Sequence, residues 1–236
     1  MSPRSKKMDS AIIIAIIGLA GTIIAALFNS QVLIAMIENK NTTPVPESDP
    51  SLPSDVTLVF DEDFEDNSAD TFVFETGEGK IEKEKSNRVL NFNGITPDSD
   101  ILARVHFGPQ VFRDGIIEFS VKYIQLGGFY LTFRNQGFSF YNLYFMPDQI
   151  LFGYNGKDAN WKAVPFENGL INHEFQIGRW YIARVEARGA DITFSLDGVR
   201  VFSIMDERIA AGNLSFDLDQ GVRVLLDDIK VWAYNK

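Results

Sequence analysis

An unbroken apolar segment near the N-terminus places the strongest constraint on how this chain folds. Residues 11–28 carry no charge and consist almost wholly of Ile, Ala, Leu, Gly and Phe. As a helix they extend roughly 27 Å, and residues 32–37 continue the apolar pattern, which is enough to cross a bilayer core of about 30 Å. The sequence therefore predicts a single transmembrane α-helix, a signal anchor, in residues 11–37, and a membrane as the first partner of the chain.

The charges around this segment predict its orientation. Basic residues lie in positions 4–7, and the positive-inside rule places such a flank in the cytoplasm. Residues 1–10 would then be cytoplasmic, and the chain from residue 38 onward would be extracytoplasmic. A cleaved signal peptide is one alternative, but its apolar region usually has about 7 to 15 residues before an A-x-A-like site, which residues 25–28 do not supply. A helix buried in a soluble core is the other alternative.

Residues 38–55 have the composition of an extended linker. Prolines at positions 44, 46, 50 and 53 lie among Asn, Thr, Ser and acidic residues. Spaced prolines favour extended chain of up to about 3.1 Å per residue, so this linker can hold a domain up to roughly 50 Å from a membrane. An inert spacer has the same composition, so the linker alone does not indicate a function.

Composition narrows the range of partners. The chain has no cysteine, which excludes disulfides, thiolate metal sites and cysteine nucleophiles. Its net charge is -10, and such a surface repels polyanions, so nucleic acid is not expected as a partner.

The apolar segment also contains small residues, Gly18, Gly21 and Thr22. They leave a narrow surface that can admit a second helix, and oligomerisation through this surface is a further hypothesis.

Residues 56–236 have the alternating pattern of β-strands. Apolar side chains occupy every second position in residues 117–123, 129–133 and 192–196, which predicts strands buried on one face. Asp197-Gly198 is a typical two-residue hairpin turn. No part of this region has a clear helical period. The pattern predicts an all-β domain, a two-sheet antiparallel β-sandwich or jelly roll.

The order of these features resembles the concanavalin A-like lectin/glucanase superfamily. The resemblance rests on residues 58–65, 115–122, 180–189, 194–198 and 226–231. Within the superfamily it is closest to laminin-G-like modules and to 3-keto-disaccharide hydrolase domains. The resemblance implies a jelly roll that binds glycans, hydrolyses them or binds proteins, commonly on its concave sheet. Fold alone does not choose among these functions.

Catalytic groups of the superfamily are not evident in the sequence. Its glucanases carry Glu-x-Asp-x-x-Glu on one strand, and the chain has no such strand; the acidic run 61–66 resembles the first strand of the fold instead. Residues 133–137 replace the Asn-Ser-Gly segment of the keto-sugar hydrolases. His106 and His173 are far apart, without the serine or acid neighbours of a triad. A glycan-degrading hydrolase or lyase is therefore the last of three hypotheses, and the chain is not expected to be an enzyme.

A binding module needs aromatic faces that stack on sugar rings and planar polar groups that bond hydroxyls. Alternation places Tyr130, Thr132 and Arg134 opposite the apolar residues of the same strand, and further aromatic residues follow. The predicted ligand-binding residues are Tyr130, Arg134, Tyr141, Asn142, Tyr144, Tyr154 and Trp161. Binding of carbohydrate or a glycoconjugate is the first hypothesis. A protein-interaction or structural subunit of a membrane or cell-surface complex is the second, because tyrosine is also a common strand residue.

Acidic residues near both ends of the domain form a candidate metal site. The first and last strands of a jelly roll often lie side by side, and carboxylates brought together repel unless a cation or protons intervene. These residues are Glu62, Asp63, Glu65, Asp66, Asp227 and Asp228. No cofactor is required by this interpretation, but a structural calcium ion would suit such oxygen ligands. The alternative is that they are solvated charges that discourage aggregation at a sheet edge.

Overall fold

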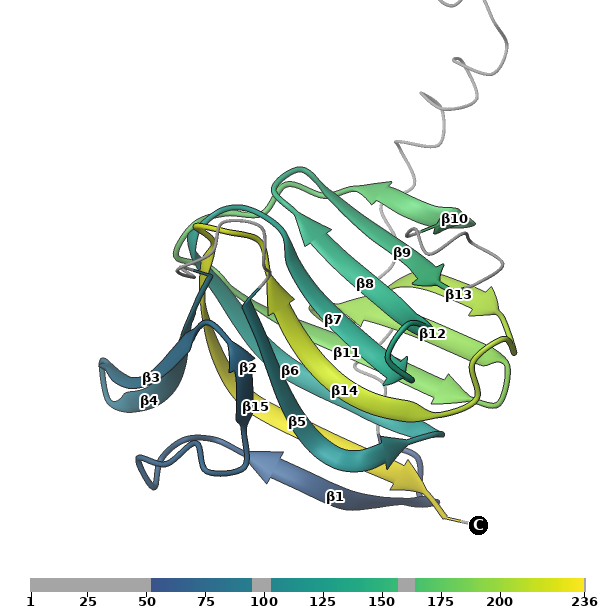
Figure 1. Ribbon diagram of the computed structural model, residues 1–236, viewed down its shortest axis with the longest axis horizontal. Coiled ribbons are helices and arrows are strands. Elements are labelled where there is room, and N and C mark those ends of the chain that lie inside the picture. Colours follow the sequence, from purple (N-terminus) through teal and green to yellow (C-terminus); the bar gives the residue numbers. More distant parts are fainter. Residues whose placement is uncertain (1–51, 95–102, 157–163, 236) are drawn as a thin grey trace, which may run out of the picture. The chain divides into compact units, whose positions relative to one another are not determined.

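The computed structural model describes residues 52–94, 103–156 and 164–235, and these residues form fifteen β-strands and no α-helix (Figure 1). No helix in this part of the chain is long and apolar enough to cross a membrane. Some predicted features lie outside the described residues: the apolar segment 11–37, its flank 1–10, and Trp161. The transmembrane helix therefore stays a prediction.

The strands form two antiparallel sheets, as the alternating pattern predicted. The seven-stranded sheet has the order β10-β9-β8-β7-β14-β5-β2. Its strands are β2 (Val73–Thr76), β5 (Ala103–Phe112), β7 (Phe129–Asn135), β8 (Phe140–Met146), β9 (Gln149–Asn155), β10 (Val164–Asn172) and β14 (Gly212–Leu218).

The eight-stranded sheet has the order β13-β12-β11-β6-β15-β4-β3, and β1 pairs with β15 beyond the end of the β4 pairing. Its strands are β1 (Val56–Glu62), β3 (Glu78–Glu84), β4 (Asn87–Asn93), β6 (Gly115–Gln125), β11 (Trp180–Arg188), β12 (Asp191–Leu196), β13 (Val199–Met205) and β15 (Arg223–Tyr234). The predicted hairpin between β12 and β13 is confirmed. Asp197 and Gly198 have φ values of 50° and 77°, as a type I′ turn requires.

Aromatic side chains fill the space between the sheets. Phe119 of the eight-stranded sheet packs edge-on against Phe216, Phe129 and Phe145 of the other sheet, with centroid separations of 4.9, 5.9 and 6.3 Å. Phe107 stacks on Phe216 at 4.2 Å. Burial of these rings contributes to the hydrophobic core that stabilises a domain without disulfides.

Candidate functional site

The outer face of the seven-stranded sheet carries two parallel rows of side chains. Directly opposed residues of antiparallel strands point to the same face, so the register of the strands defines each row. The first row is Leu151, Tyr144, Tyr130, Asp217 and Arg104. The second row is Gly153, Asn142, Thr132, Ser215, His106 and Val73. Figure 1 shows these strands side by side. We call the side chains of the two rows the polar face.

Two tyrosines form a fixed aromatic pair in the first row. The rings of Tyr130 and Tyr144 stack with centroids 3.9 Å apart and planes within 10°. Their hydroxyls donate to the two carboxylate oxygens of Asp219, at 2.7 and 2.9 Å. Burial first, and then the hydrogen bonds to its neighbours, raises the pKa of Tyr130 well above its usual range. The pair therefore stays protonated, and its ring surface is held in one place.

A glycine makes this arrangement possible. A Cβ atom on Gly128 would lie 2.2 Å from an Asp219 oxygen and 2.4 Å from the Tyr144 ring. Any larger residue would push the carboxylate away from the two hydroxyls. Glycine at position 128 thus leaves the space that Asp219 and Tyr144 occupy.

Asp217 lies at the centre of the polar face and is only 2% exposed. Its carboxylate accepts hydrogen bonds from the Nε of Arg104, from Thr132 Oγ1 at 2.8 Å and from Ser215 Oγ at 3.3 Å. A buried carboxylate is stable only when its charge and lone pairs are satisfied in this way. Asp217 therefore fixes side chains from three adjacent strands.

Three buried acceptor atoms beside this network have no hydrogen-bond partner among the described residues. They are Asn142 Oδ1, His106 Nδ1 and Asn213 Oδ1. Glu75 lies 3.1 Å from His106 Nε2, and a proton donated from Nε2 leaves Nδ1 as an acceptor. Buried polar atoms without partners are uncommon in folded proteins. His173 Nε2 and Arg184 NH2, which lie elsewhere in the domain, also lack a partner among the described residues, so these atoms alone do not mark a ligand site.

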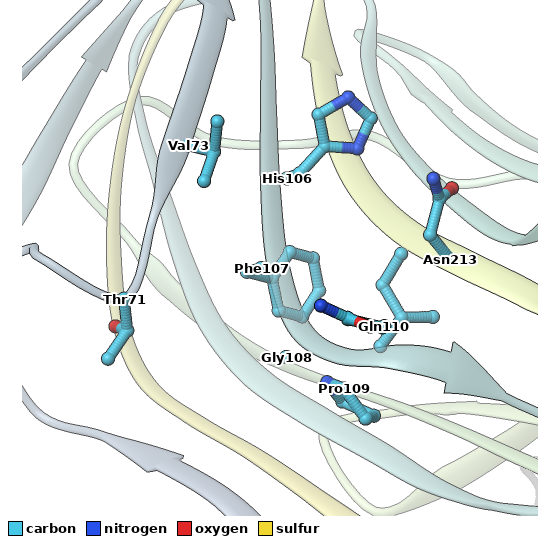
Figure 2. Close-up of a pocket in the computed structure, with 9 residues that line it drawn as sticks. Thr71, Val73, His106, Phe107, Gly108, Pro109, Gln110 and Asn213 are labelled. Atoms are coloured by element: carbon cyan, nitrogen blue, oxygen red, sulfur yellow. The ribbon is translucent and has the colours of Figure 1, made fainter.

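A pocket of about 260 Å³ adjoins the polar face where β2, β5 and β14 meet. Figure 2 shows the His106 ring and the Asn213 side chain at its edge, with Thr71 and Val73 on the β2 side. Its other lining residues are Phe107, Gly108, Pro109, Gln110 and Leu214. The pocket is smaller than most sites for small molecules, which have about 300 to 1,000 Å³.

No family model and no curated protein matches the sequence. Solved structures do match the fold. The carbohydrate-binding module CBM66 from Bacillus subtilis has 13% identity and a TM-score of 0.52, covering 67% of this chain and 93% of that one. Domain 4 of AbnA, a GH43 extracellular arabinanase from Geobacillus stearothermophilus solved with arabinotriose, has 13% identity and a TM-score of 0.52, covering 76% and 94%. The Bacillus licheniformis β-glucanase has 10% identity and a TM-score of 0.55, covering 75% and 98%.

The fold is the concanavalin A-like jelly roll. The jelly-roll fold that the resemblance implied is thereby confirmed. At these identities the likeness establishes the fold and leaves the function to the residues of the site.

Arg134 is not on the polar face of the jelly roll, although simple alternation placed it there. Its φ of 49° interrupts the alternation, and the side chain is 1% exposed. The guanidinium donates to the carbonyls of Arg113, Ile209 and Gly189 at 2.8 to 3.1 Å. It also contacts Asp114 at 3.2 Å. Arg134 is therefore buried and does not form part of the predicted ligand surface.

Tyr141 and Tyr154 lie on the inner side of the seven-stranded sheet. Tyr141 is fully buried, and its hydroxyl donates to Asp206. Tyr154 is its partner in the register, is half-buried, and stacks under the guanidinium of Arg208 at 4.1 Å. Tyr141 and Tyr144 are three positions apart on one strand and must face opposite ways. Of the predicted ligand residues, Tyr130, Asn142 and Tyr144 lie together on the polar face.

The sequence interpretation did not single out Asp217, Ser215, Arg104 or Asn213. A local signal existed, because polar residues alternate with apolar ones along residues 213–218. Their convergence depends on the register of β14 with β5 and β7, which are distant in sequence.

The acidic residues near the first loop of the jelly roll accept hydrogen bonds from that loop and from β4. β1 does pair with β15, as expected. The Glu62 carboxylate accepts from Phe64 N and Thr71 Oγ1 at 3.0 and 2.8 Å. Asp63, Glu65 and Asp66 likewise accept from backbone amides of the loop or of β4. These bonds explain the acidic run as loop structure.

Asp227 is the acid of this group that is buried, at 4% exposure. It accepts from Asn87 and from the backbone N of Asp228. Burial raises the pKa of Asp227 to about 6, with smaller contributions from the charges of Asp228 and Glu65. Within the described ranges, no group of three or more His, Asp or Glu side chains is arranged to hold a metal ion. Calcium binding stays a prediction.

Proposed function

We propose that the jelly roll binds carbohydrate through the polar face and the adjoining pocket. The observation that carries this proposal is the stacked pair Tyr130 and Tyr144, which Asp219 holds in place on a face that also carries half-buried polar side chains such as Asn142. The apolar faces of sugar rings pack on aromatic side chains, and sugar hydroxyls form hydrogen bonds with polar side chains beside them. The structural neighbours described as a carbohydrate-binding module and as an arabinotriose complex support the same ligand class.

Asn142→Leu tests this function. Leucine has nearly the shape of asparagine but carries no amide group to form a hydrogen bond with a sugar hydroxyl, so affinity should fall roughly fivefold for one lost bond of about 1 kcal/mol. The melting temperature should stay constant or rise, because the change removes a buried polar atom without a partner. Binding is measured by calorimetry on the full-length protein in detergent, with arabinan and mixed-linkage β-glucan as first probes.

The control is Ser203→Leu, an exposed position on β13 of the other sheet. It should bind like the unaltered protein. A panel of neutral and acidic polysaccharides that gives no binding with the unaltered protein would contradict the proposal. Equal binding by the Asn142 variant would move the site away from the polar face.

We also propose that residues 11–37 anchor the jelly roll outside the membrane, with residues 38–55 as the linker. Binding through a few aromatic and polar contacts gives micromolar to millimolar affinity, and many copies on one membrane would raise retention. Domains anchored in one membrane can therefore retain a weakly bound ligand better than domains that diffuse freely.

Protease accessibility tests the anchor. Protease added to intact cells should release the jelly roll by cleavage within residues 38–55 and leave the anchor in the membrane, because spaced prolines keep this linker extended and exposed. Protection of the domain in intact cells would reverse the orientation. A soluble mature protein that begins near residue 30 would show that the segment is a cleaved signal peptide.

A further inference from the structure

Arg104 has hydrogen-bond donors that the polar face itself does not use. Its side chain is 29% exposed, and its Nε donates to the buried carboxylate of Asp217. The terminal nitrogens Nη1 and Nη2 donate to none of the described residues, and Nη1 lies 3.9 Å from the Glu75 carboxylate, beyond hydrogen-bond range. Both terminal nitrogens are therefore available to donate to a ligand.

Asp217 holds this guanidinium in one orientation. One of its carboxylate oxygens accepts from Arg104 Nε, and the other accepts from Thr132 and Ser215 at 2.8 and 3.3 Å. Because the carboxylate is buried and bonded to both neighbouring strands, it cannot turn without losing these bonds. A guanidinium is planar, so a fixed Nε also constrains the plane in which Nη1 and Nη2 donate. Little conformational entropy is then lost when a ligand binds to them.

Glu75 places an acceptor next to these donors. Its side chain is 56% exposed, and its Oε2 lies 3.1 Å from His106 Nε2 and 3.9 Å from Arg104 Nη1. The other carboxylate oxygen, Oε1, has no hydrogen bond to any described residue. Accessible donors and an accessible acceptor thus lie side by side where β2 pairs with β5, next to the pocket that His106 lines.

This arrangement matches a pair of neighbouring hydroxyls. A hydroxyl both accepts and donates hydrogen bonds, so one of the pair can accept from Arg104 while the other donates to Glu75. Hydrogen bonds to charged groups are about twice as strong as those between neutral groups, and a planar pair of donors adds geometric specificity.

Strand spacing separates this arrangement from the tyrosine pair. Arg104 and Tyr130 are two strands apart in one row, which places their backbones about 10 Å from each other. A single sugar ring is smaller than this separation. A sugar unit at Arg104 would therefore be a neighbour of the unit that stacks on the tyrosines.

We infer that Arg104 and Glu75 form a second recognition point, which binds two adjacent hydroxyls of a sugar unit next to the unit stacked on Tyr130 and Tyr144. The inference rests on the proposed carbohydrate function and names the residues that determine its specificity. A glycan whose hydroxyls are substituted at this unit should bind weakly even though its rings can still stack on the tyrosines.

Arg104→Lys tests the donors. Lysine keeps a positive charge for Asp217 but lacks the planar pair of donors, so affinity for arabinan and for mixed-linkage β-glucan should fall about tenfold. The matched control is Arg223→Lys on β15 of the other sheet, because Arg223 is also partly exposed and also pairs with a carboxylate, that of Glu82. The control should bind like the unaltered protein in calorimetry on the full-length protein in detergent.

Glu75→Gln tests the acceptor at a position that is more than half exposed. Affinity should fall severalfold, because an amide oxygen accepts less strongly than a carboxylate. Glu82→Gln changes the net charge equally beside Arg223 and should leave affinity unchanged. Arg104→Lys could weaken binding by loosening Asp217, which a melting temperature lower by several degrees would reveal, and Glu75→Gln would then decide.

O-methylation of the same two polysaccharides tests the hydroxyls. A methyl ether cannot donate to Glu75, so the unaltered protein should bind the methylated forms at least about tenfold more weakly. This ratio should become severalfold smaller in Glu75→Gln and stay unchanged in Glu82→Gln. The same ratio in both variants would show that the hydroxyls do not contact Glu75 and would overturn the inference.

The outcomes separate this inference from the proposed function. Unchanged binding by both Arg104→Lys and Glu75→Gln would overturn the inference and leave carbohydrate binding standing. Absence of binding to arabinan, to mixed-linkage β-glucan and to the wider panel would remove the proposed function and the inference together.

Discussion

Replacing Arg134 with methionine should lower the free energy of unfolding by about 3–5 kcal/mol, because three backbone carbonyls lose their donor and each buried group left unpaired costs about 1–3 kcal/mol. The guanidinium is 1% exposed and holds three connections between strands through the carbonyls of Arg113, Gly189 and Ile209. Methionine fills similar space but donates no hydrogen bond. The three carbonyls and the Asp114 carboxylate would lose their common partner.

Denaturant unfolding of the full-length protein measures this loss. Arg179→Met is the matched control, because Arg179 is half exposed and pairs with Asp197 on the surface. It should cost no more than about 1 kcal/mol. Arg134→Lys should fall between the two, since one ammonium group cannot reach all four acceptors. Similar small losses of unfolding free energy in both methionine variants would show that Arg134 does not stabilise the three connections that it contacts.

Replacing Asp227 with asparagine should raise stability at neutral pH by about 1–3 kcal/mol. The pKa of Asp227 is about 6 in the folded chain against an ordinary 3.8, so the folded state binds this proton more tightly than the unfolded state does. The stability contributed by the proton is complete below about pH 4 and is lost as the pH rises through 6. At about 1.4 kcal/mol per pKa unit, the ionised carboxylate costs at most about 3 kcal/mol.

Asparagine is neutral throughout and keeps an oxygen for the Asp228 amide. The difference in unfolding free energy between Asp227→Asn and the unaltered protein should therefore grow from near zero at pH 4 to its full value at pH 8. Asp228→Asn, at the exposed neighbouring position, should change little. A destabilised Asp227 variant at pH 8, together with stabilisation of the unaltered protein by millimolar Ca²⁺, would show that the ionised carboxylate holds a cation.

Strands with one buried face were predictable from sequence, and so was the edge strand β13 through its hairpin turn, but the edge strands β2, β3 and β10 were missed. The alternation in residues 117–123 and 192–196 predicted β6 and β12, since both have one side against the core. β3 was missed because Glu-Gly-Lys-Ile-Glu-Lys-Glu contains one large apolar residue. A charged edge strand of this kind packs little and is stabilised by pairing with β4, while its charges oppose aggregation.

The site was predictable only as far as local geometry extends. Alternation correctly placed Tyr130 and Thr132 opposite the buried residues of β7. It failed at Arg134, where a left-handed backbone conformation reverses the side-chain direction. Asp217 was missed because its hydrogen bond with Thr132 joins residues 85 positions apart. The register between two strands so far apart cannot be predicted from the sequence of either strand alone.

The pairing of β1 with β15 determines how the jelly roll would carry mechanical load. The first residue of β1, Val56, lies opposite Tyr234 near the C-terminus, and Asn235 N donates to Asp55 O at 2.8 Å (Figure 1). Tension transmitted through residues 38–55 would reach the domain at this end of the ladder. β1 would then be the first strand to bear the load, through its pairing with β15. The polar face belongs to the other sheet, so β1 could detach under force before the ligand surface was disturbed.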